Sequence, residues 1–177
     1  CVSRSFGRKV TELEELNQSI TTHCINAAEK IRLDKQTAKK ITVFIRTSSF
    51  QINKNYYANS KAIDLPIETN DSIELVKQAL SALKCIYRKG YKYQKTGIIL
   101  SKLKDVNSYK ENLFSLVNNE EKRKKLMKVI DYTNIRYGRN ALSIAQAGLS
   151  KKWNLKRQYS SKIDTACFEL LPIIKAS

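Results

Sequence analysis

The sequence has few of the residues from which many active sites and irregular scaffolds are built. Among 177 residues there are five glycines, two prolines, one histidine, one methionine and one tryptophan. The scarcity of glycine and proline excludes collagen-like and loop-dominated structures. No run of about 18 apolar residues is present, so no membrane-spanning segment is expected. Because the chain begins with Cys1 rather than methionine, we expect a fragment or a processed product of a longer protein.

The four cysteines form neither a zinc site nor a disulfide framework. Cys1, Cys24, Cys85 and Cys167 include no Cys-x-x-Cys pair, whereas a structural zinc site needs closely spaced soft ligands. Cys24 and Cys85 fall on apolar helical stripes, which predicts reduced core residues of a cytosolic protein. His23 has no carboxylate nearby in sequence to orient it. A partly exposed helical residue is therefore favoured over a metal ligand or a catalytic base.

The charge is strongly one-sided. There are 33 lysines and arginines against 16 acids, a net charge of +17. Such a surface favours a polyanion, either nucleic acid or an anionic membrane, over a merely solvated lysine-rich surface. Residues 35–63 and 75–104 contain no aspartate or glutamate, while Glu12, Glu14, Glu15 and Glu29 lie close together.

Hydrophobic periodicity predicts two helices among four strands. After an extended basic segment over Ser3–Val10, a capping box of Thr11 and Glu14 precedes a helix. Its apolar face consists of Leu13, Leu16, Ile20, Cys24, Ala28 and Ile31. Strands are predicted over Lys39–Ser48, within Tyr56–Thr69 and over about Tyr91–Leu103. The second helix begins at Asp71 and ends before Gly90, with an apolar stripe of Ile73, Val76, Leu80, Leu83 and Tyr87.

The element order β-α-β-β-α-β predicts an α+β, ferredoxin-like domain over residues 1–103. Both helices would cover one face of a four-stranded antiparallel sheet and leave the other face open to a ligand. Since the two acid-free runs fall on the strands, the open face is expected to follow a phosphate backbone.

Beyond the predicted domain the pattern weakens. Residues 104–118 are interpreted as a linker, and residues 119–177 as a mostly helical or irregular extension. A third helix is predicted over residues 119–134, capped by Asn118 with Glu121, and the basic run 122–125 would be a solvated face. Residues 135–177 lack periodicity, which predicts a partly ordered tail that needs a partner.

The chain lacks the patterns of enzymatic sites. It contains no phosphate-binding glycine loop and no nucleophile elbow. Asp64, Asp105 and Asp131 are too far apart in the pattern to hold Mg²⁺. The hydroxyl residues 47–49 have no candidate base nearby in sequence. A binding module is therefore the favoured class.

Three binding hypotheses remain, and each makes a structural demand. A module for duplex DNA requires Arg4 and Arg46 on one open sheet face. A stand-alone RNA-binding module of the same fold requires exposed aromatic platforms there, from Phe44, Tyr56 or Tyr57. A basic protein-interaction scaffold requires an apolar patch, for which the candidates are Leu113, Phe114 and Trp153.

Several motifs, taken in order, resemble a known family. Residues 4–7 (Arg-Ser-Phe-Gly), 44–50 (Phe-Ile-Arg-Thr-Ser-Ser-Phe), 90–97 (Gly-Tyr-Lys-Tyr-Gln-Lys-Thr-Gly) and 112–114 (Asn-Leu-Phe) are similar to the C-terminal part of the UmuC-type Y-family translesion DNA polymerases. The resemblance covers nearly the whole chain. Residues 1–103 resemble the little finger domain. The remainder resembles the UmuC-type extension, through Tyr137–Asn140, Ala147, Gly148, Trp153 and Arg157.

The resemblance implies a function that composition alone does not. The little finger of this family lies in the major groove of primer–template DNA and holds its phosphates. The matching positions are Arg4, Ser5, Phe6, Gly7, Arg46, Thr47, Ser48, Lys95 and Thr96. The catalytic carboxylates and their Mg²⁺ belong to domains that would precede residue 1. No cofactor is therefore expected in this fragment, and it should not polymerise by itself.

The resemblance also implies protein partners. Asn112, Leu113 and Phe114 occupy the place of the family's sliding-clamp motif, but Lys110 replaces its glutamine and Glu111 replaces an apolar residue. Clamp binding is therefore expected to be weakened. The extension of the family contacts processed UmuD and the RecA filament during SOS mutagenesis. These relationships imply a protein of the bacterial cytoplasm, working at the nucleoid.

Overall fold

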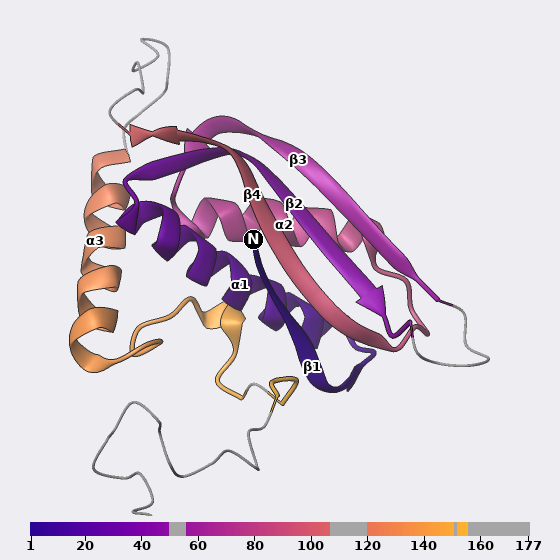
Figure 1. Ribbon diagram of the computed structural model, residues 1–177. Coiled ribbons are helices and arrows are strands. Elements are labelled where there is room, and N and C mark those ends of the chain that lie inside the picture. Colours follow the sequence, from indigo (N-terminus) through magenta and orange to yellow (C-terminus); the bar gives the residue numbers. More distant parts are fainter. Residues whose placement is uncertain (50–55, 107–119, 151, 156–177) are drawn as a thin grey trace, which may run out of the picture.

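Figure 1 shows the computed structural model, which describes residues 1–49, 56–106, 120–150 and 152–155. The elements in chain order are β1 (Val2–Val10), α1 (Leu13–Leu33), β2 (Gln36–Thr47), β3 (Ala58–Thr69), α2 (Ser72–Ile86), β4 (Tyr93–Asp105), α3 (Glu120–Tyr137) and the short 3₁₀ helix η2 (Ala145–Ala147). The predicted α+β class and the β-α-β-β-α-β order are confirmed. Within the described ranges, no helix is long and apolar enough to cross a membrane.

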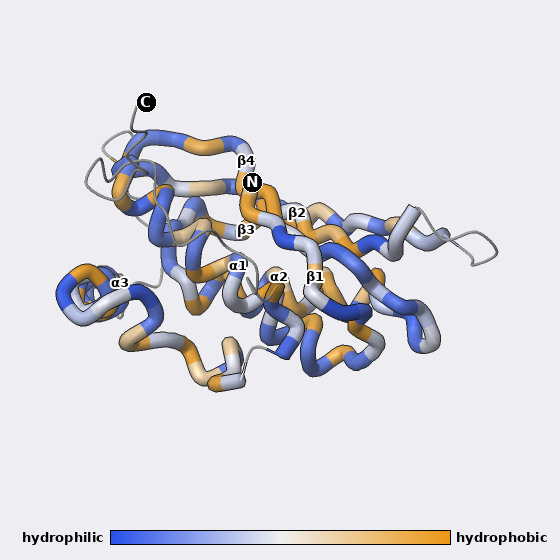
Figure 2. Tube along the Cα trace, turned by 60° about the horizontal axis from the view of Figure 1, so that its bottom comes forward, coloured by the Kyte–Doolittle hydropathy of each residue, from blue (hydrophilic) through white to orange (hydrophobic). Residues whose placement is uncertain are grey.

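The four strands form one antiparallel sheet in the order β1-β4-β2-β3. Since β4 is antiparallel to both of its neighbours, β1 and β2 run in the same direction with β4 between them. In the same way β3 and β4 are parallel and separated by β2. Each helix therefore connects two parallel strands that are one strand apart, the split βαβ arrangement. Figure 2 shows the sheet lying over α1 and α2, which leaves its other face open.

The core lies between the sheet and the two helices. Ile41, Val43 and Ile45 alternate along β2 and are at most 1% exposed, as the period of two in the sequence predicted. Opposite them, Leu16, Ile20, Cys24 and Ala28 of α1 have no exposed surface. The predicted core role of Cys24 is confirmed, and its burial raises the pKa of the thiol above its usual range.

The two helix starts differ from each other. Asp71 caps α2, since its carboxylate accepts hydrogen bonds from the amides of Ile73 at 2.7 Å and Glu74 at 3.4 Å. At α1 the predicted capping box is wrong. Glu12 is the N-cap and makes no side-chain cap bond, because the Thr11 hydroxyl donates to the Glu12 carboxylate at 3.0 Å instead.

The buried face of α2 is rotated relative to the predicted stripe. The helix buries Leu75, Val76, Ala79, Ala82, Leu83 and Ile86. Ile73, by contrast, is 41% exposed. The predicted core role of Cys85 is also wrong, since that thiol is exposed. The helix ends at Ile86, and Gly90 adopts a φ of 91° in the turn that follows.

Two ion pairs hold α3 against the ends of α1 and α2. Arg32 of α1 donates from two nitrogens to Asp131, each at 2.7 Å, and from a third to the backbone oxygen of Asn70. Arg123 lies 2.6 Å from the second carboxylate oxygen of Asp71. The interpretation of residues 122–125 as a purely solvated face is therefore wrong for Arg123. Figure 1 shows α3 standing against the end of α1.

The segment after α3 returns to the sheet domain. Gly7 of β1 donates its amide to the backbone oxygen of Trp153 at 3.0 Å, and the Trp153 ring is 3% exposed. A Cβ on Gly7 would lie 2.8 Å from the Asn154 oxygen, so only glycine permits this approach. Gly148 packs closely on Gln18 of α1. Residues 138–150 and 152–155, which belong to the predicted partly ordered tail, thus pack on the sheet domain.

Candidate nucleic-acid interface

The strand register brings two predicted cations together on the open face. Lys95 of β4 pairs with Ser5 of β1 on one side and with Arg46 of β2 on the other. Residues directly opposite each other in antiparallel strands point to the same face. Arg46 is exposed and Lys95 half-buried, and neither has an acidic partner among the residues that the structure describes. Ser5, Lys95 and Arg46 therefore form one polar row across three strands.

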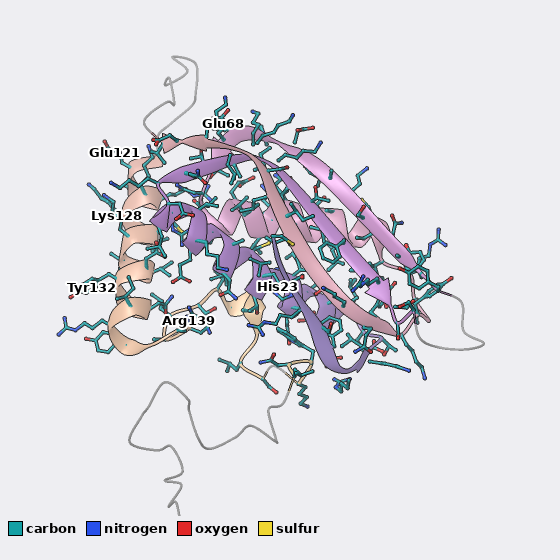
Figure 3. All side chains as sticks on the ribbon, viewed as in Figure 1. His23, Glu68, Glu121, Lys128, Tyr132 and Arg139 are labelled. Carbon is teal, nitrogen blue, oxygen red and sulfur yellow. The ribbon has the colours of Figure 1, made fainter. Side chains whose placement is uncertain are left out.

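The lysines at the opposite end of the sheet are neutralised. Lys102 donates to Asp64 at 3.1 Å, and Lys104 donates to Glu68 at 2.6 Å. The bond from Lys102 also holds the pKa of the Asp64 carboxyl below its usual range. Figure 3 shows Glu68 at this end of the sheet, on the side where α3 begins with Glu121. The acid-free strand runs therefore do not make the whole face equally basic, because β3 supplies acids to one end only.

The centre of the open face is flat. Phe44 lies across Gly97, where an added Cβ would come within 2.5 Å of the ring and 2.4 Å of the Ser3 Cβ. The same row continues to Ser60 on β3, and the neighbouring row ends at Ala58. Small residues (Ser3, Gly97 and Ser60) thus share one row with a half-buried ring, so that a bulky ligand can approach the strands closely there.

Arg4 lies on the other side of the sheet from Arg46, which corrects the expectation that both share the open face. Arg4 pairs with Thr96, and the Thr96 hydroxyl lies 2.9 Å from the Ser19 hydroxyl of α1. That contact fixes the Arg4–Thr96 row on the helix side. Arg4 itself is exposed because β1 is an edge strand.

Several other predicted contact residues are engaged inside the protein. The Phe6 ring is 1% exposed and meets the Trp153 ring edge-on at 6.0 Å. Thr96 has no exposed surface, and the Thr47 hydroxyl accepts the Tyr57 amide at 2.9 Å. The Gly7 amide is bonded to Trp153, as described above. Ser5 is exposed and Ser48 is half-buried.

The aromatic residues mostly form a packed cluster rather than stacking platforms. The Tyr57 ring is 9% exposed, its hydroxyl donates to the Ile86 oxygen at 2.6 Å, and it stacks on Tyr91 at 4.8 Å. Arg88 lies over the same ring at 5.0 Å. Of the three candidate platforms only Tyr56 is largely exposed, at 57%. This cluster fixes the basic loop after α2 at the same end of the sheet as Thr47.

Sequence reasoning missed a buried polar cluster around His23. The imidazole is 1% exposed rather than partly exposed, and its Nε2 lies 3.3 Å from the Ser19 hydroxyl. Trp153 covers it, with ring centroids 6.2 Å apart. Burial, helped by the charge of Arg4, lowers the pKa of His23 to about 4. The neutral ring is a core residue, and the signal for it is its spacing of three residues from the buried Ile20 and seven from the buried Leu16.

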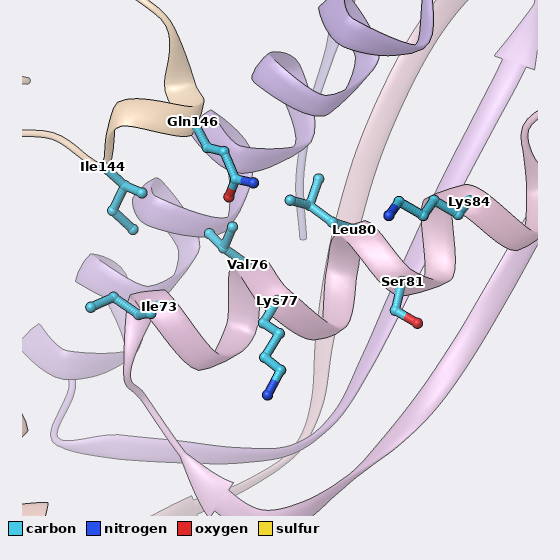
Figure 4. Close-up of a pocket in the computed structure, with 8 residues that line it drawn as sticks. All are labelled: Ile73, Val76, Lys77, Leu80, Ser81, Lys84, Ile144 and Gln146. Carbon is cyan, nitrogen blue, oxygen red and sulfur yellow. The ribbon is translucent and has the colours of Figure 1, made fainter. Parts of the chain in front are cut away.

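The described residues offer no other chemical centre. They contain no cluster of three histidine, cysteine or acidic side chains that could hold a metal ion. An open groove of about 360 Å³ runs between α2 and η2, lined by apolar and lysine side chains (Figure 4). It contains no acid–base pair. The predicted clamp segment, Asn112, Leu113 and Phe114, lies outside the described residues.

The described residues thus combine a split βαβ sheet with a cationic row of Arg46 and Lys95 at one end of its open face. Residues 1–113 match the family model of the impB/mucB/samB family C-terminal domain, so the chain belongs to this family, whose C-terminal domain is the little finger of Y-family polymerases. Residues 124–174 match a domain of unknown function, DUF4113.

Curated relatives agree with the family match. The chain is 37% identical to Protein UmuC of Salmonella typhimurium strain LT2 over 159 residues, which is 90% of this chain and 38% of that protein. It is 31% identical to Protein ImpB of Salmonella typhimurium over 173 residues, 98% of this chain and 41% of that protein. Protein MucB of Escherichia coli is 34% identical over 97% of this chain and 40% of its own length. The chain thus spans about two fifths of these relatives.

Proposed function

We propose that the open sheet face binds the phosphate backbone of duplex primer–template DNA, at the end where Arg46 and Lys95 lie. The observation that carries this proposal is their shared row on the open face, without acidic partners in the described chain. Ser5 extends the row onto the edge strand. Flexible cations beside a flat surface suit phosphates, which carry no sequence information.

The family supports a role within a larger protein. We propose that the chain is the DNA-gripping part of an error-prone translesion polymerase of SOS mutagenesis, acting in the bacterial cytoplasm. The catalytic residues and their Mg²⁺ would lie in the part that the relatives have in addition. The domain would hold the duplex while a distorted template base occupies the active site elsewhere. The sliding clamp, processed UmuD and RecA stay proposed partners of the same protein.

The test is fluorescence anisotropy of a labelled hairpin primer–template with the 177-residue chain, over a salt series. The double variant Arg46→Ala/Lys95→Ala is expected to weaken binding and to reduce the slope of log K against log salt by about 2, since each lost phosphate contact removes about one counterion. The matched control is Lys77→Ala/Lys84→Ala on α2, on the opposite side of the sheet, which removes the same net charge. Equal losses in both variants would contradict the proposal.

The RNA-binding alternative is less well supported, because the Tyr57 ring is internal and the Phe44 ring is half-buried against Gly97. Only Tyr56 keeps a largely exposed ring. Adding a single-stranded RNA of the same length to the titration separates the two functions. A preference for RNA that disappears in Tyr56→Leu would replace duplex DNA as the ligand.

A further inference from the structure

The two sides of α3 have different chemistry. Its inner side carries Met127, which is 3% exposed, together with the ion-paired Arg123 and Asp131. These contacts fix the rotation of the helix. The opposite side has no contact with the sheet domain among the described residues, and Figure 3 shows Lys128 and Tyr132 there, on the outer edge of the molecule.

Cations recur along this outer side. Lys125, Lys128 and Arg136 follow one another at helical spacing and are exposed, and Arg139 follows in the turn after the helix. Glu121 is the exposed acid at the start of the helix, one turn before Lys125. Asp131 does not offset the charge here, because it is bonded to Arg32 on the inner side.

Two exposed tyrosines lie among these cations and are tied to one of them. Tyr132 is 60% exposed and Tyr137 is 70% exposed. Arg136 donates to the Tyr132 hydroxyl at 3.0 Å, while its guanidinium lies over the Tyr137 ring at 5.6 Å. The three side chains are therefore in contact with one another without a ligand. We call the surface of Lys125, Lys128, Tyr132, Arg136 and Tyr137 the outer stripe.

We propose that the outer stripe is a binding site for single-stranded nucleic acid, separate from the sheet face. Exposed aromatic rings stack with unpaired bases, and neighbouring cations hold the phosphates between them. A duplex offers the phosphates, but its bases are stacked on one another. The cations could therefore bind a duplex, whereas the tyrosine rings would have no free base to stack on. The exposed Lys125, Lys128 and Arg136 favour a polyanion over an uncharged partner, with exposed aliphatic side chains of Leu126, Val129 and Ile135 beside them on the same helix.

This site does not depend on the proposed function of the open sheet face, because it shares no residue with it. The pairing of Arg32 with Asp131 gives the stripe a fixed position on the domain. A chain that uses both surfaces would hold a duplex on the sheet and an unpaired strand along α3.

The first experiment is photo-crosslinking of the 177-residue chain to a 20-nucleotide single strand of thymidines with one 5-iododeoxyuridine, followed by peptide mapping. Crosslinks are expected at Tyr132 or Tyr137, with much lower yield when the strand is annealed to its complement. They should persist in Arg46→Ala/Lys95→Ala, which separates this site from the sheet face. Crosslinks confined to other residues would overturn the proposal.

The second experiment measures affinity for the same strand by anisotropy. Tyr132→Leu/Tyr137→Leu should weaken binding about tenfold or more, since two stacked bases are lost. Tyr56→Leu is the matched control, because that ring is also exposed but lies at the sheet. Both tyrosines of the stripe are largely exposed, so the fold should survive, as circular dichroism would verify. Unchanged affinity, or equal affinity of the chain for poly-glutamate, would show a site without stacking and would refute the assignment.

Discussion

Arg32 and Asp131 join the first helix of the sheet domain to α3 through two parallel hydrogen bonds of 2.7 Å. Their side chains are 11% and 22% exposed, so the pair is largely shielded from water. Arg32 also holds the Asn70 oxygen and the Ser72 hydroxyl, which lie at the start of α2. One guanidinium thus connects three helices.

Asp131→Asn should release α3 from the domain. The variant removes the charge but keeps the shape, and it leaves a shielded arginine without its counter-ion, at a cost of about 2–3 kcal/mol. Hydrogen exchange should show the α3 amides losing protection by one to two orders of magnitude, about what that cost implies, while the β2 amides stay protected. Lys125→Ala, on the exposed side, is the control. Protection equal to that of the parent chain would show that Met127 and the Arg123–Asp71 ion pair suffice.

Trp153→Ala should uncouple the returning segment from β1. The ring fills the space between Phe6 and His23, so its removal should cost about 3–5 kcal/mol, as in other truncations of buried aromatics. Urea denaturation measures the loss of stability. Hydrogen exchange of the Gly7 amide tests whether its bond to the Trp153 backbone is lost in the variant. Leu155→Ala, at a 59% exposed position, should change stability by less than about 0.5 kcal/mol. A fast-exchanging Gly7 amide in the parent chain would contradict the contact.

Acid should destabilise the fold through His23. Its folded pKa of about 4 lies below the ordinary 6.5, so the unfolded chain takes up a proton first as pH falls. Above pH 6.5 the imidazole is neutral in both the folded and the unfolded chain, and the fold has its full stability. Between pH 6.5 and 4 only the unfolded chain takes up the proton, which lowers the free energy of unfolding by about 3 kcal/mol in total. Urea midpoints of the parent chain and of His23→Leu over this range should diverge. Parallel pH profiles for the two proteins would refute this role.

Gly97→Ala should destabilise the sheet through Phe44. The new methyl would overlap the Phe44 ring and the Ser3 Cβ, and forcing the ring aside should cost about 1–3 kcal/mol. Phe44→Ala in the same background should recover part of that cost, so the double-mutant cycle should show a favourable coupling. Thermal unfolding of the parent chain, the two single variants and the double variant measures the stability of each. Additive effects would mean that strand distortion, rather than the ring, sets the cost.

Local signals predicted the fold well because each was contained within a few residues. Asp71 caps its helix through amides two and three residues away, and the alternation of Ile41, Val43 and Ile45 fixed the buried face of β2. The family motifs, each a few residues long, predicted the family in the same local way. These features need no knowledge of distant partners.

The site itself was harder to predict, because its faces depend on register between distant strands. Arg4 was placed beside Arg46, but pairing with Thr96 puts it on the helix side. His23 looked exposed because the residue that covers it, Trp153, lies far along the chain. The acids that neutralise Lys102 and Lys104 come from β3, which the acid-free runs did not reveal.

The position of β1 at the sheet edge has a consequence for how the chain acquires its structure. Val2 pairs with Ile98 and the Gly7 amide bonds to Trp153, so both partners of β1 lie far along the chain from it. Contacts between such distant residues slow folding, because the intervening loop must close first. During synthesis on a ribosome, β1 would leave the exit tunnel early and stay unpaired until β4 follows. The bond from Gly7 to Trp153 can form only once the Trp153 segment has also been released, so full pairing of β1 follows its synthesis by about 150 residues.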